Sequence, residues 1–176
     1  MTYKTADLCD GCDFVQVCEL PFRNFGQKRS FDGAIRTVRC YEDFALIRDT
    51  VKMPGHDQVL VIDGGGSLSK ALLGDLMAKF VLDNDWAGLV IHGAVRDSFE
   101  IDKMPVGVKA LGTAPRRGER TGIGEIDVPV HFGGVTFCPG RWLVADDDGV
   151  IVLPEGVKRN EIRILVSTPL QQTTTS

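Results

Sequence analysis

The sequence predicts a single α/β domain, and three observations support that fold class. Two short apolar runs, at residues 59–62 and 88–93, flank a segment whose apolar side chains recur at helical spacing. A strand–helix–strand unit of this kind is right-handed and makes its two strands parallel. From residue 106 onward the pattern changes to short apolar runs separated by glycine turns, which are typical of strands. The length of 176 residues suits one domain that buries its core without disulfides or a structural metal.

The first part of the chain contains one predicted strand and one predicted helix. Residues 5–20 are expected to form a short helix or an irregular opening, and residues 24–26 a loop. Residues 35–41 alternate apolar and polar side chains, which predicts a strand with one solvent-facing side. Residues 42–52 carry apolar side chains at helical spacing and end before a Pro-Gly pair, which stops a helix.

The central unit begins with a strand that is expected to be buried on both faces. Residues 59–62 are Val-Leu-Val-Ile, a continuous apolar run of the kind found inside parallel sheets. After the glycines at 64–66, residues 68–81 carry an apolar stripe at helical spacing. Glycine weakens a helix by about 1 kcal/mol relative to alanine. We therefore expect a break at Gly74, with Asp75 capping a new helix.

A second buried strand and a series of short strands complete the predicted sheet. The second buried strand covers residues 88–93. The later strands are expected at residues 106–111, 128–132, 135–137, 142–145 and 150–153. Gly133-Gly134 and Asp148-Gly149 lie between neighbouring strands and suit hairpin turns with positive φ.

The C-terminal region is expected to close the domain and then continue as a tail. Residues 155–166 are predicted to form a closing helix. Residues 167–176 form a polar C-terminal tail. Since no internal repeat or linker interrupts the chain before that point, the predicted domain covers residues 1–166.

The charge balance and hydropathy argue against several classes of partner. The chain has 24 acidic and 20 basic residues, so its formal net charge is −4. A mildly acidic surface is a poor electrostatic match for nucleic acid or anionic lipid. No apolar run approaches the roughly 18 residues that a membrane span needs, and charges interrupt the N-terminus before any signal-peptide core develops. The sequence therefore predicts a cytoplasmic protein with no membrane partner and no direct nucleic-acid partner.

The cysteines do not form a recognisable set of metal ligands. They are Cys9, Cys12, Cys18, Cys40 and Cys138. Cys9 and Cys12 have C-x-x-C spacing, but a zinc site needs a second pair or a cysteine–histidine partner at similar spacing. We therefore expect small, half-buried, reduced thiols rather than a metal or redox centre.

The glycines at 64–66 suggest a nucleotide-binding loop, but the complete motifs are absent. A dinucleotide fingerprint needs G-x-G-x-x-G, and Ser69 occupies the last position of that pattern. A phosphate-binding loop needs Gly-Lys-Ser or Gly-Lys-Thr, which does not follow. We therefore expect no nucleotide site, although backbone N–H groups of this loop could still meet another anion.

The candidate site combines two stretches of the central unit. Arg96 and Asp97 directly follow a buried parallel strand, at the sheet edge where open α/β folds bind ligands. A helix that starts near Gly74 would offer an anion the backbone N–H groups of Gly74, Asp75, Leu76 and Met77. An arginine binds a carboxylate through its planar fork, and an aspartate suits a largely hydrated Mg²⁺. The combination describes a site for a 2-oxo acid, and the alternative is a surface Arg–Asp pair beside an ordinary helix break.

Other candidate residues have simpler interpretations. Residues 146–148 are three aspartates without the alternating spacing of a calcium loop, so a solvated hairpin turn is expected. Residues 116–120 could form a basic docking patch or a flexible charged loop. His92 precedes a glycine on a buried strand and is expected to be a core histidine near the site. Lys70 and Lys79 are expected to be solvated helix residues rather than nucleophiles.

Several short stretches carry a resemblance to a known family. They are residues 24–26, 59–67, 71–75, 93–97, 122–125 and 132–137. On these motifs the chain resembles, from about residue 8 to 152, the family of the regulator of ribonuclease activity A and the metal-dependent 4-hydroxy-4-methyl-2-oxoglutarate aldolases. Aldolase members carry an aspartate, 20 intervening residues and then Arg-Asp. Asp75 and Arg96-Asp97 have this spacing, with residues 76–95 between them, and Glu100 could fill the acidic position that follows.

The resemblance implies both a fold and an activity. The fold would be a single-domain layered β/β/α sandwich of the swivelling-domain type, assembled as a homotrimer or a dimer of trimers. The activity would be that of a divalent-metal-dependent class II aldolase, which cleaves 4-hydroxy-4-methyl-2-oxoglutarate and related 4-hydroxy-2-oxo acids to pyruvate. The same site should decarboxylate oxaloacetate, because the loss of CO₂ yields the same pyruvate enolate.

The resemblance also implies a role for each site residue. The N–H groups of residues 74–77 would bind the substrate carboxylate, with Arg96 against substrate oxygens. Asp97 would anchor Mg²⁺ or Mn²⁺, mostly through its hydration shell, and Asp75 would handle protons through water. The family's other role is to bind and inhibit an endoribonuclease of the ribonuclease E type. A regulator has no need of Arg96 and Asp97, so their presence favours the enzyme without excluding a second role.

Overall fold

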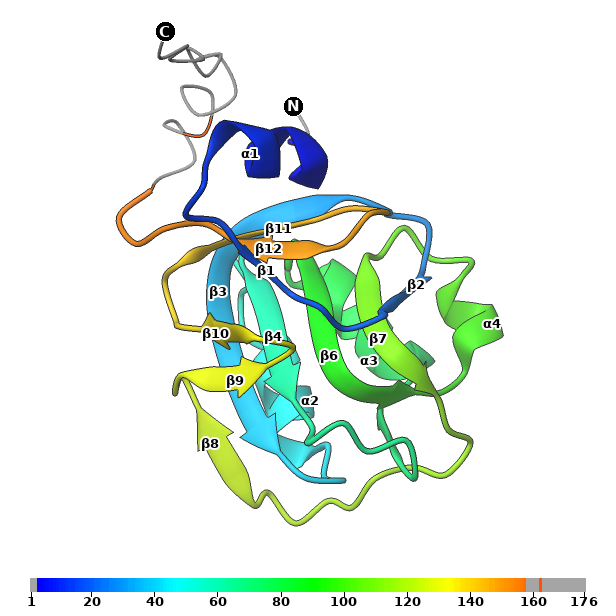
Figure 1. Ribbon diagram of the computed structural model, residues 1–176. Coiled ribbons are helices and arrows are strands. Elements are labelled where there is room, and N and C mark those ends of the chain that lie inside the picture. Colours follow the sequence, from blue (N-terminus) through cyan, green and yellow to red (C-terminus); the bar gives the residue numbers. More distant parts are fainter. Residues whose placement is uncertain (1–2, 158–161, 163–176) are drawn as a thin grey trace, which may run out of the picture.

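The apolar residues of one short strand face two different cores, and this sets the layering of the molecule. In β4 (Val59–Asp63), Val59 and Val61 contact one core cluster, whereas Leu60 and Ile62 contact another. Successive side chains of a strand point to opposite faces of a sheet, so β4 needs a cover on both faces. The structure is a computed structural model that describes residues 3–157 and 162, and it supplies both covers (Figure 1).

The central layer is a largely parallel sheet. Its neighbouring strands are β3 (Phe31–Cys40), β4, β6 (Gly88–Val95) and β7 (Val108–Thr113), in that order and all parallel. Two short strands extend it in the antiparallel sense: β2 (Arg23–Phe25) pairs with β7, and β8 (Gly124–Ile126) pairs with β3. The parallel pairing of β4 and β6 confirms the predicted crossover unit.

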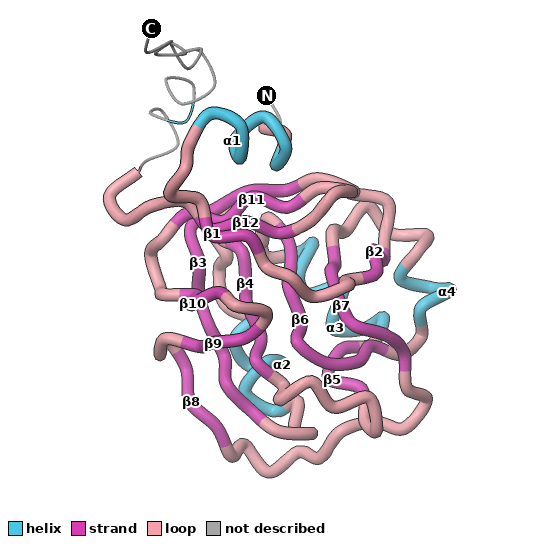
Figure 2. Tube along the Cα trace, viewed as in Figure 1, coloured by secondary structure: helices cyan, strands magenta, loops and turns pink. Residues whose placement is uncertain are grey.

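Helices cover one face of this sheet. They are α2 (Ala45–Val51), α3 (Asp75–Asp83) and α4 (Ser98–Ile101). Ile47, Val81 and Ile101 are fully buried in the core beneath these helices. Figure 2 shows α2 and α3 behind the central strands.

Strands cover the opposite face. The hairpin of β9 (Val130–Phe132) and β10 (Val135–Phe137) packs its apolar side chains against the second core. The main sheet continues from β3 through β11 (Trp142–Ala145), β12 (Val150–Val152) and β1 (Gln16–Val17), and α1 (Thr5–Gly11) buries Leu8 against these strands. The result is the β/β/α layering that the resemblance implied.

Most of the predicted strands are present within a few residues of their expected bounds. The strand expected at 35–41 is the longer β3, and the helix expected at 42–52 is the shorter α2. Gly133 and Gly134 have φ of +57° and +76°, which confirms a turn that depends on glycine. The 148–149 hairpin also forms between β11 and β12, but Gly149 does not have the positive φ that was expected.

The helix expected from residue 68 is wrong in its first half. Residues 71–73 form a strand, β5 (Ala71–Leu73), which pairs in parallel with the end of β6. The break at Gly74 is confirmed, and α3 begins at Asp75 with Gly74, not Asp75, as its N-cap. The reason is that β6 offers a free edge to residues 71–73. Their backbone groups form hydrogen bonds with this edge, and these bonds favour a strand although the apolar side chains have helical spacing.

Two other differences concern short or terminal segments. The loop expected at 24–26 is partly a strand, because Asn24 and Phe25 pair with β7, and β8 has no counterpart in the prediction. The predicted closing helix at 155–166 and the tail at 167–176 lie mostly outside the described residues. Within the described part of the chain, no helix has the length and apolar character needed to cross a bilayer.

A buried carboxylate joins the start of α2 to the segment that follows β7. Asp43 is 3% exposed and accepts N–H hydrogen bonds from Ala45, Thr121 and Gly122, at 2.8, 2.6 and 3.1 Å. The Thr121 hydroxyl donates to the same carboxylate. Burial alone would raise the pKa of Asp43, but these hydrogen bonds outweigh it and hold the pKa below its ordinary value.

We expect Asp43→Asn to lower the free energy of unfolding by about 2–3 kcal/mol at neutral pH, because an amide loses the charge-assisted bonds. The folded-state pKa lies below the unfolded-state pKa. The charge of Asp43 therefore contributes its full stabilisation at pH values above the unfolded-state pKa. This stabilisation is lost as the pH falls through the folded-state pKa. Urea unfolding of wild type and variant at about pH 7 and about pH 3 measures this dependence.

A matched control is Glu125→Gln, which removes a charge from an exposed pair with Arg39 at 2.9 Å. It should change the unfolding free energy by less than about 0.5 kcal/mol at either pH. If Asp43→Asn lowers the free energy of unfolding by the same amount at both pH values, the result contradicts the role assigned to the charge of Asp43.

Candidate active site

The short strand β5 places Gly74 against Arg96 and Asp97. Leu73 pairs with Val95, and the Arg96 N–H donates to the Leu73 carbonyl at 2.9 Å. The approach is close: an ideal Cβ on Gly74 would lie 2.7 Å from Asp97 Oδ2 and 3.3 Å from Arg96 Nε. The structure therefore brings together the two stretches that the sequence spacing singled out.

Asp97 occupies a special backbone position between β6 and α4. Its φ of +53° lies in the left-handed region, which aspartate adopts more readily than most residues other than glycine. Its Oδ2 lies 3.3 Å from Arg96 Nε, and its side chain is 37% exposed. One carboxylate oxygen therefore faces Arg96, while the side chain remains open to solvent and to a hydrated cation.

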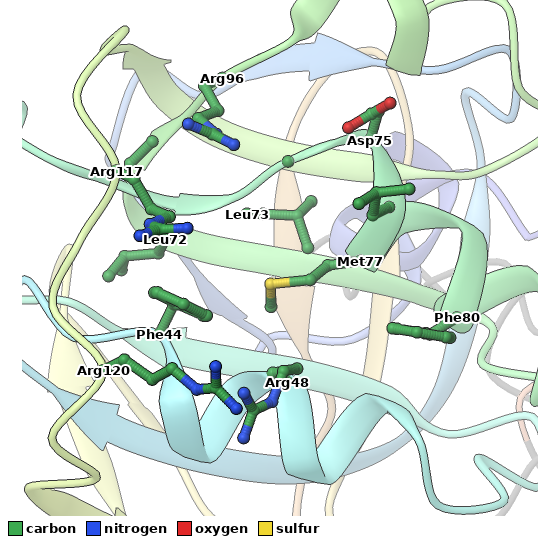
Figure 3. A pocket seen from close by; sticks show the side chains of 13 residues that line it. Phe44, Arg48, Leu72, Leu73, Asp75, Met77, Phe80, Arg96, Arg117 and Arg120 are labelled. Atoms are coloured by element: carbon green, nitrogen blue, oxygen red, sulfur yellow. The ribbon is translucent and has the colours of Figure 1, made fainter.

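A pocket of about 230 Å³ opens beside this junction (Figure 3). It is lined by Phe44, Arg48, Ala71, Leu72, Leu73, Gly74, Asp75, Leu76, Met77, Phe80, Arg96, Arg117 and Arg120. All the substrate-binding residues proposed from sequence are in this lining. Asp97 is not, and lies next to Gly74 and Arg96 instead.

The start of α3 faces the pocket with free backbone donors. The first N–H groups of a helix have no partner within it. No acceptor among the described residues takes the N–H groups of Asp75 and Leu76. The Met77 N–H differs, because it donates to the Gly74 carbonyl at 3.1 Å. The two free N–H groups and the positive end of the helix dipole suit an anion.

Three further arginines line the pocket, and sequence reasoning did not assign them to a ligand site. Arg48 comes from α2, whereas Arg117 and Arg120 come from the segment after β7. A signal existed for the latter two: their segment follows a strand that neighbours β6, so it starts at the same sheet edge as Arg96. Arg48 has no comparable signal, because helical spacing alone does not show which partner a helix face meets.

The remaining candidates lie elsewhere or already have partners. His92 Nδ1 is 3.1 Å from Asp63 Oδ1, its ring stacks on Phe132 at 4.6 Å, and it does not line the pocket. Lys70 is not on a helix; its Nζ is 2.7 Å from Glu119 Oε1, in an exposed ion pair. Neither group is placed to act on a ligand in the pocket.

The aspartate turn joins β11 to β12 as the predicted hairpin turn, with Asp147 and Asp148 exposed and Asp146 half-buried. Asp146 accepts hydrogen bonds from the N–H and the hydroxyl of Thr5, at 2.8 and 2.7 Å. Asp147 pairs with Arg29 at 2.7 Å. The turn therefore fastens α1 and the start of β3 to the β11–β12 hairpin.

The cysteines are buried to different degrees: Cys18 and Cys40 are buried, and Cys9, Cys12 and Cys138 are half-buried as expected. All five are free thiols, and Cys9 and Cys12 are only partly exposed. Across the described residues, no group of three or more His, Cys, Asp or Glu side chains is arranged to hold a metal ion. A fully protein-coordinated metal of the zinc type therefore has no ligand set in this part of the chain.

Comparison with known proteins identifies one family. The model of the RraA-like family, described as Aldolase/RraA, matches residues 5–152. A relative from Azotobacter vinelandii is 49% identical over 162 residues, which is 92% of this chain and all of the relative. It carries the provisional name 4-hydroxy-4-methyl-2-oxoglutarate aldolase.

Two solved structures share the fold but bear different names. The RNA-processing inhibitor RraA from Thermus thermophilis superposes with a TM-score of 0.84 at 42% identity, covering 90% of this chain and 98% of its own. A Geobacillus kaustophilus protein is described as an S-adenosylmethionine:2-dimethylmenaquinone methyltransferase. It superposes with a TM-score of 0.82 at 50% identity, covering 85% of this chain and 94% of its own. The fold is thus common to proteins that are named for three different functions.

The tight approach at Gly74 leads to a prediction. In Gly74→Ala the new methyl would displace Arg96 and Asp97, which are side chains that can move, so the fold should persist. We expect a thermal midpoint within about 2–4 °C of the wild type, equivalent to about 1 kcal/mol or less. Affinity for a 2-oxo acid such as pyruvate should fall at least about tenfold, because misplaced donors bind poorly. Calorimetry and thermal unfolding measure the two effects.

Gly149→Ala is the matched control, since no atom lies within 4 Å of its added methyl and its φ is not positive. It should leave both quantities unchanged. Unaltered 2-oxo acid binding by Gly74→Ala would show that the ligand does not use this junction.

Proposed function

The chain belongs to the RraA-like family, and from this membership we propose that it is a divalent-metal-dependent aldolase cleaving 4-hydroxy-4-methyl-2-oxoglutarate and related 4-hydroxy-2-oxo acids to pyruvate. The observation that carries the proposal is one pocket in which Arg96 and the start of α3 converge. Those groups suit the adjacent keto and carboxylate oxygens of a 2-oxo acid.

The chain's own donors would orient the substrate. The N–H groups of Asp75 and Leu76 would receive the C1 carboxylate at the helix start. Arg96 engages Asp97 through Nε, which holds the guanidinium in place and leaves its terminal nitrogens for substrate oxygens. Leu73 and Met77 supply an apolar wall, which strengthens these polar contacts by limiting water.

A hydrated divalent cation fits the donors beside the pocket. Asp97 is a single, partly exposed carboxylate, and Mg²⁺ is commonly bound by one or two carboxylates while it keeps several waters. Mn²⁺ suits the same oxygen ligands. When bound, such a cation would stabilise negative charge that develops on the keto oxygen. Asp97 would hold it next to Arg96, at the oxygen end of the substrate.

Asp75 is the acidic residue in the pocket wall and would handle protons. In the cleavage, the 4-hydroxyl loses its proton, the C3–C4 bond breaks, and its electron pair passes into the enolate of pyruvate. A proton then returns to C3 and completes the product. Asp75, half-exposed at the helix start, would accept and return these protons through a water molecule. Oxaloacetate would reach the same enolate by loss of CO₂.

The charge of the pocket argues against a methyltransferase activity for this chain, although one relative bears that name. S-adenosylmethionine carries a sulfonium cation, and four arginines with one aspartate line this pocket. Like charges repel strongly in a partly desolvated site. The same arginines favour anionic substrates.

Binding to an endoribonuclease is the second candidate function. The likeness to the Thermus inhibitor, over 90% of this chain, supports it. That role would use the outer surface of the protein and would not need Arg96 or Asp97. The two functions can therefore be tested separately.

We expect the purified protein to release pyruvate from 4-hydroxy-4-methyl-2-oxoglutarate and from oxaloacetate when Mg²⁺ or Mn²⁺ is present. This release should stop when EDTA is added. Asp97→Ala should abolish the metal-dependent rate. Arg96→Lys keeps the charge but loses the planar fork, so kcat/KM should fall by about 10²-fold, or about 2.7 kcal/mol. A coupled assay of pyruvate release measures each rate.

Wild-type rates in Asp97→Ala or Arg96→Lys would place the chemistry elsewhere. Failure of every 4-hydroxy-2-oxo acid, together with inhibition of an added ribonuclease E-type enzyme, would favour the regulator instead. Arg116→Met serves as a control, because Arg116 lies beside the pocket segment but does not line the pocket.

We also propose that the protein assembles as a trimer or a dimer of trimers. Leu76 and Phe99, on the adjacent helices α3 and α4, are each 72% exposed, and Ile123 is 76% exposed. Large exposed apolar side chains of this kind are typical of surfaces that partners cover. Light scattering should give a mass near three or six times 19.2 kDa, and a monomer at micromolar concentration would refute the assembly.

A further inference from the structure

The pocket carries far more positive charge than one 2-oxo carboxylate needs. Four arginines line it, and Asp75 is the acidic residue among the lining. In Figure 3, Arg96 and Asp75 lie at one end of the view, and Arg48 and Arg120 lie at the other with their guanidinium groups turned toward each other. Arg117 and Phe44 lie between the two ends. The positive charge is therefore distributed along the pocket.

Two of these charges, Arg117 in the middle of the pocket and Arg120 at its second end, have no ion-pair partner among the described residues. Arg96 is paired with Asp97, and Arg48 with Asp49 at 2.7 Å. Within the described ranges, neither Arg117 nor Arg120 makes an ion pair. Converging like charges repel each other, and a bound anion removes that cost.

Two nearby acidic residues make their close contacts with groups outside the pocket lining. Glu119 is between the two arginines in sequence, but its carboxylate pairs with Lys70 at 2.7 Å. Glu42 accepts a hydrogen bond from Ser67 at 2.7 Å and lies 3.5 Å from Lys70. Both carboxylates are thus engaged by groups outside the pocket lining.

The backbone that presents these arginines is held on both sides. Arg117 forms a bridge with Ala71, where the Gly118 N–H donates to the Ala71 carbonyl at 2.9 Å. Its guanidinium lies 5.6 Å from the ring centroid of Phe44, a cation–π contact that orients it. Thr121 directly follows Arg120, and its backbone N–H donates to the Asp43 carboxylate, which holds this part of the segment in place. Donors held in place bind an anion with less loss of conformational freedom.

We propose that Arg117 and Arg120, assisted by Arg48, form a second anion subsite that binds the distal carboxylate of the substrate and selects 2-oxo dicarboxylic acids. The inference rests on the proposed function in one respect, that the 2-oxo acid end lies at Arg96 and the start of α3. The guanidinium fork is suited to a carboxylate, and forks in the middle of the pocket (Arg117) and at its second end (Arg120) suit a ligand with a second negative charge.

The subsite also discriminates between the two reactions of such a pocket. Cleavage of 4-hydroxy-4-methyl-2-oxoglutarate breaks C3–C4 and leaves the distal carboxylate, still charged, on the second pyruvate. Decarboxylation of oxaloacetate breaks the bond to the distal carboxylate itself, which leaves as neutral CO₂ while its electron pair forms the enolate. Arginines that hold this charge stabilise the substrate of decarboxylation but not its transition state. The pocket therefore favours aldol cleavage.

The test compares two uncleavable probes that differ only at the distal end. 2-Oxoglutarate has a carboxylate where 2-oxopentanoate has a methyl group, and both have five carbons. We expect calorimetry with Mg²⁺ present to show at least tenfold tighter binding of 2-oxoglutarate to the wild type, equivalent to about 1.4 kcal/mol. The double variant Arg117→Met/Arg120→Met should lose that difference, and its affinity for 2-oxopentanoate should change by less than about twofold.

The controls separate this inference from the proposed function. Arg116→Met, a neighbouring arginine outside the lining, should retain the preference, and Arg120→Met alone should lose part of it. Equal affinities of the wild type for both probes, no binding of either, or a preference that survives in the double variant would each overturn the subsite. Arginine-dependent preference for 2-oxoglutarate in a protein that releases no pyruvate would support the subsite and refute the aldolase.

Discussion

A three-residue strand, β5, determines where every group of the site lies. Ala71 pairs with Ala94 of β6 on one edge, and on the other its N–H donates to the Arg116 carbonyl at 2.7 Å. The Leu73 carbonyl accepts the Arg96 N–H, and α3 begins two residues later. Because β5 is paired on both edges, it fixes the start of α3, the end of β6 and the arginine segment relative to one another. All three residues of β5 are buried, as a strand in this position must be.

That same strand is one of the parts of the fold that the sequence did not predict. Leu68 and Leu72 are four residues apart, which matches one face of a helix, and no alternation is visible in a segment of three residues. The strands that were predicted, such as β4 and β12, have apolar runs bounded by glycine or proline and need no distant partner to be recognised. β5 and β8 gain their conformation from an edge supplied by residues more than 20 positions away, which a local pattern does not contain.

The residues of the candidate site also fall into two groups: those that the sequence indicates and those that only the structure places in the pocket. Gly74, Asp75, Arg96 and Asp97 could be found from sequence, because strand ends and helix starts are local features and their spacing matches a family. Arg117 was visible only as part of a charged loop, which is solvated in most proteins. Its place in the pocket depends on the Ala71 bridge and on Asp43, two long-range interactions. Sequence therefore indicates the end of the pocket at Gly74 and Arg96, and the structure is needed to place the other arginines.

The chain's net charge of −4 and its arginine-lined pocket are compatible because surface charges are screened over about 8–10 Å. Glu119, the acidic residue between Arg117 and Arg120 in sequence, pairs with Lys70 outside the pocket lining. The apolar side chains of Phe44 and Met77 line the same cavity, so a ligand there is partly removed from water and interacts more strongly with the guanidinium groups. A net negative charge and a basic pocket together would repel anions from most of the surface and attract them to one place. Selectivity for a small polycarboxylate then requires no net positive charge on the protein, and the same arrangement does not attract a polyanion such as RNA to the whole surface.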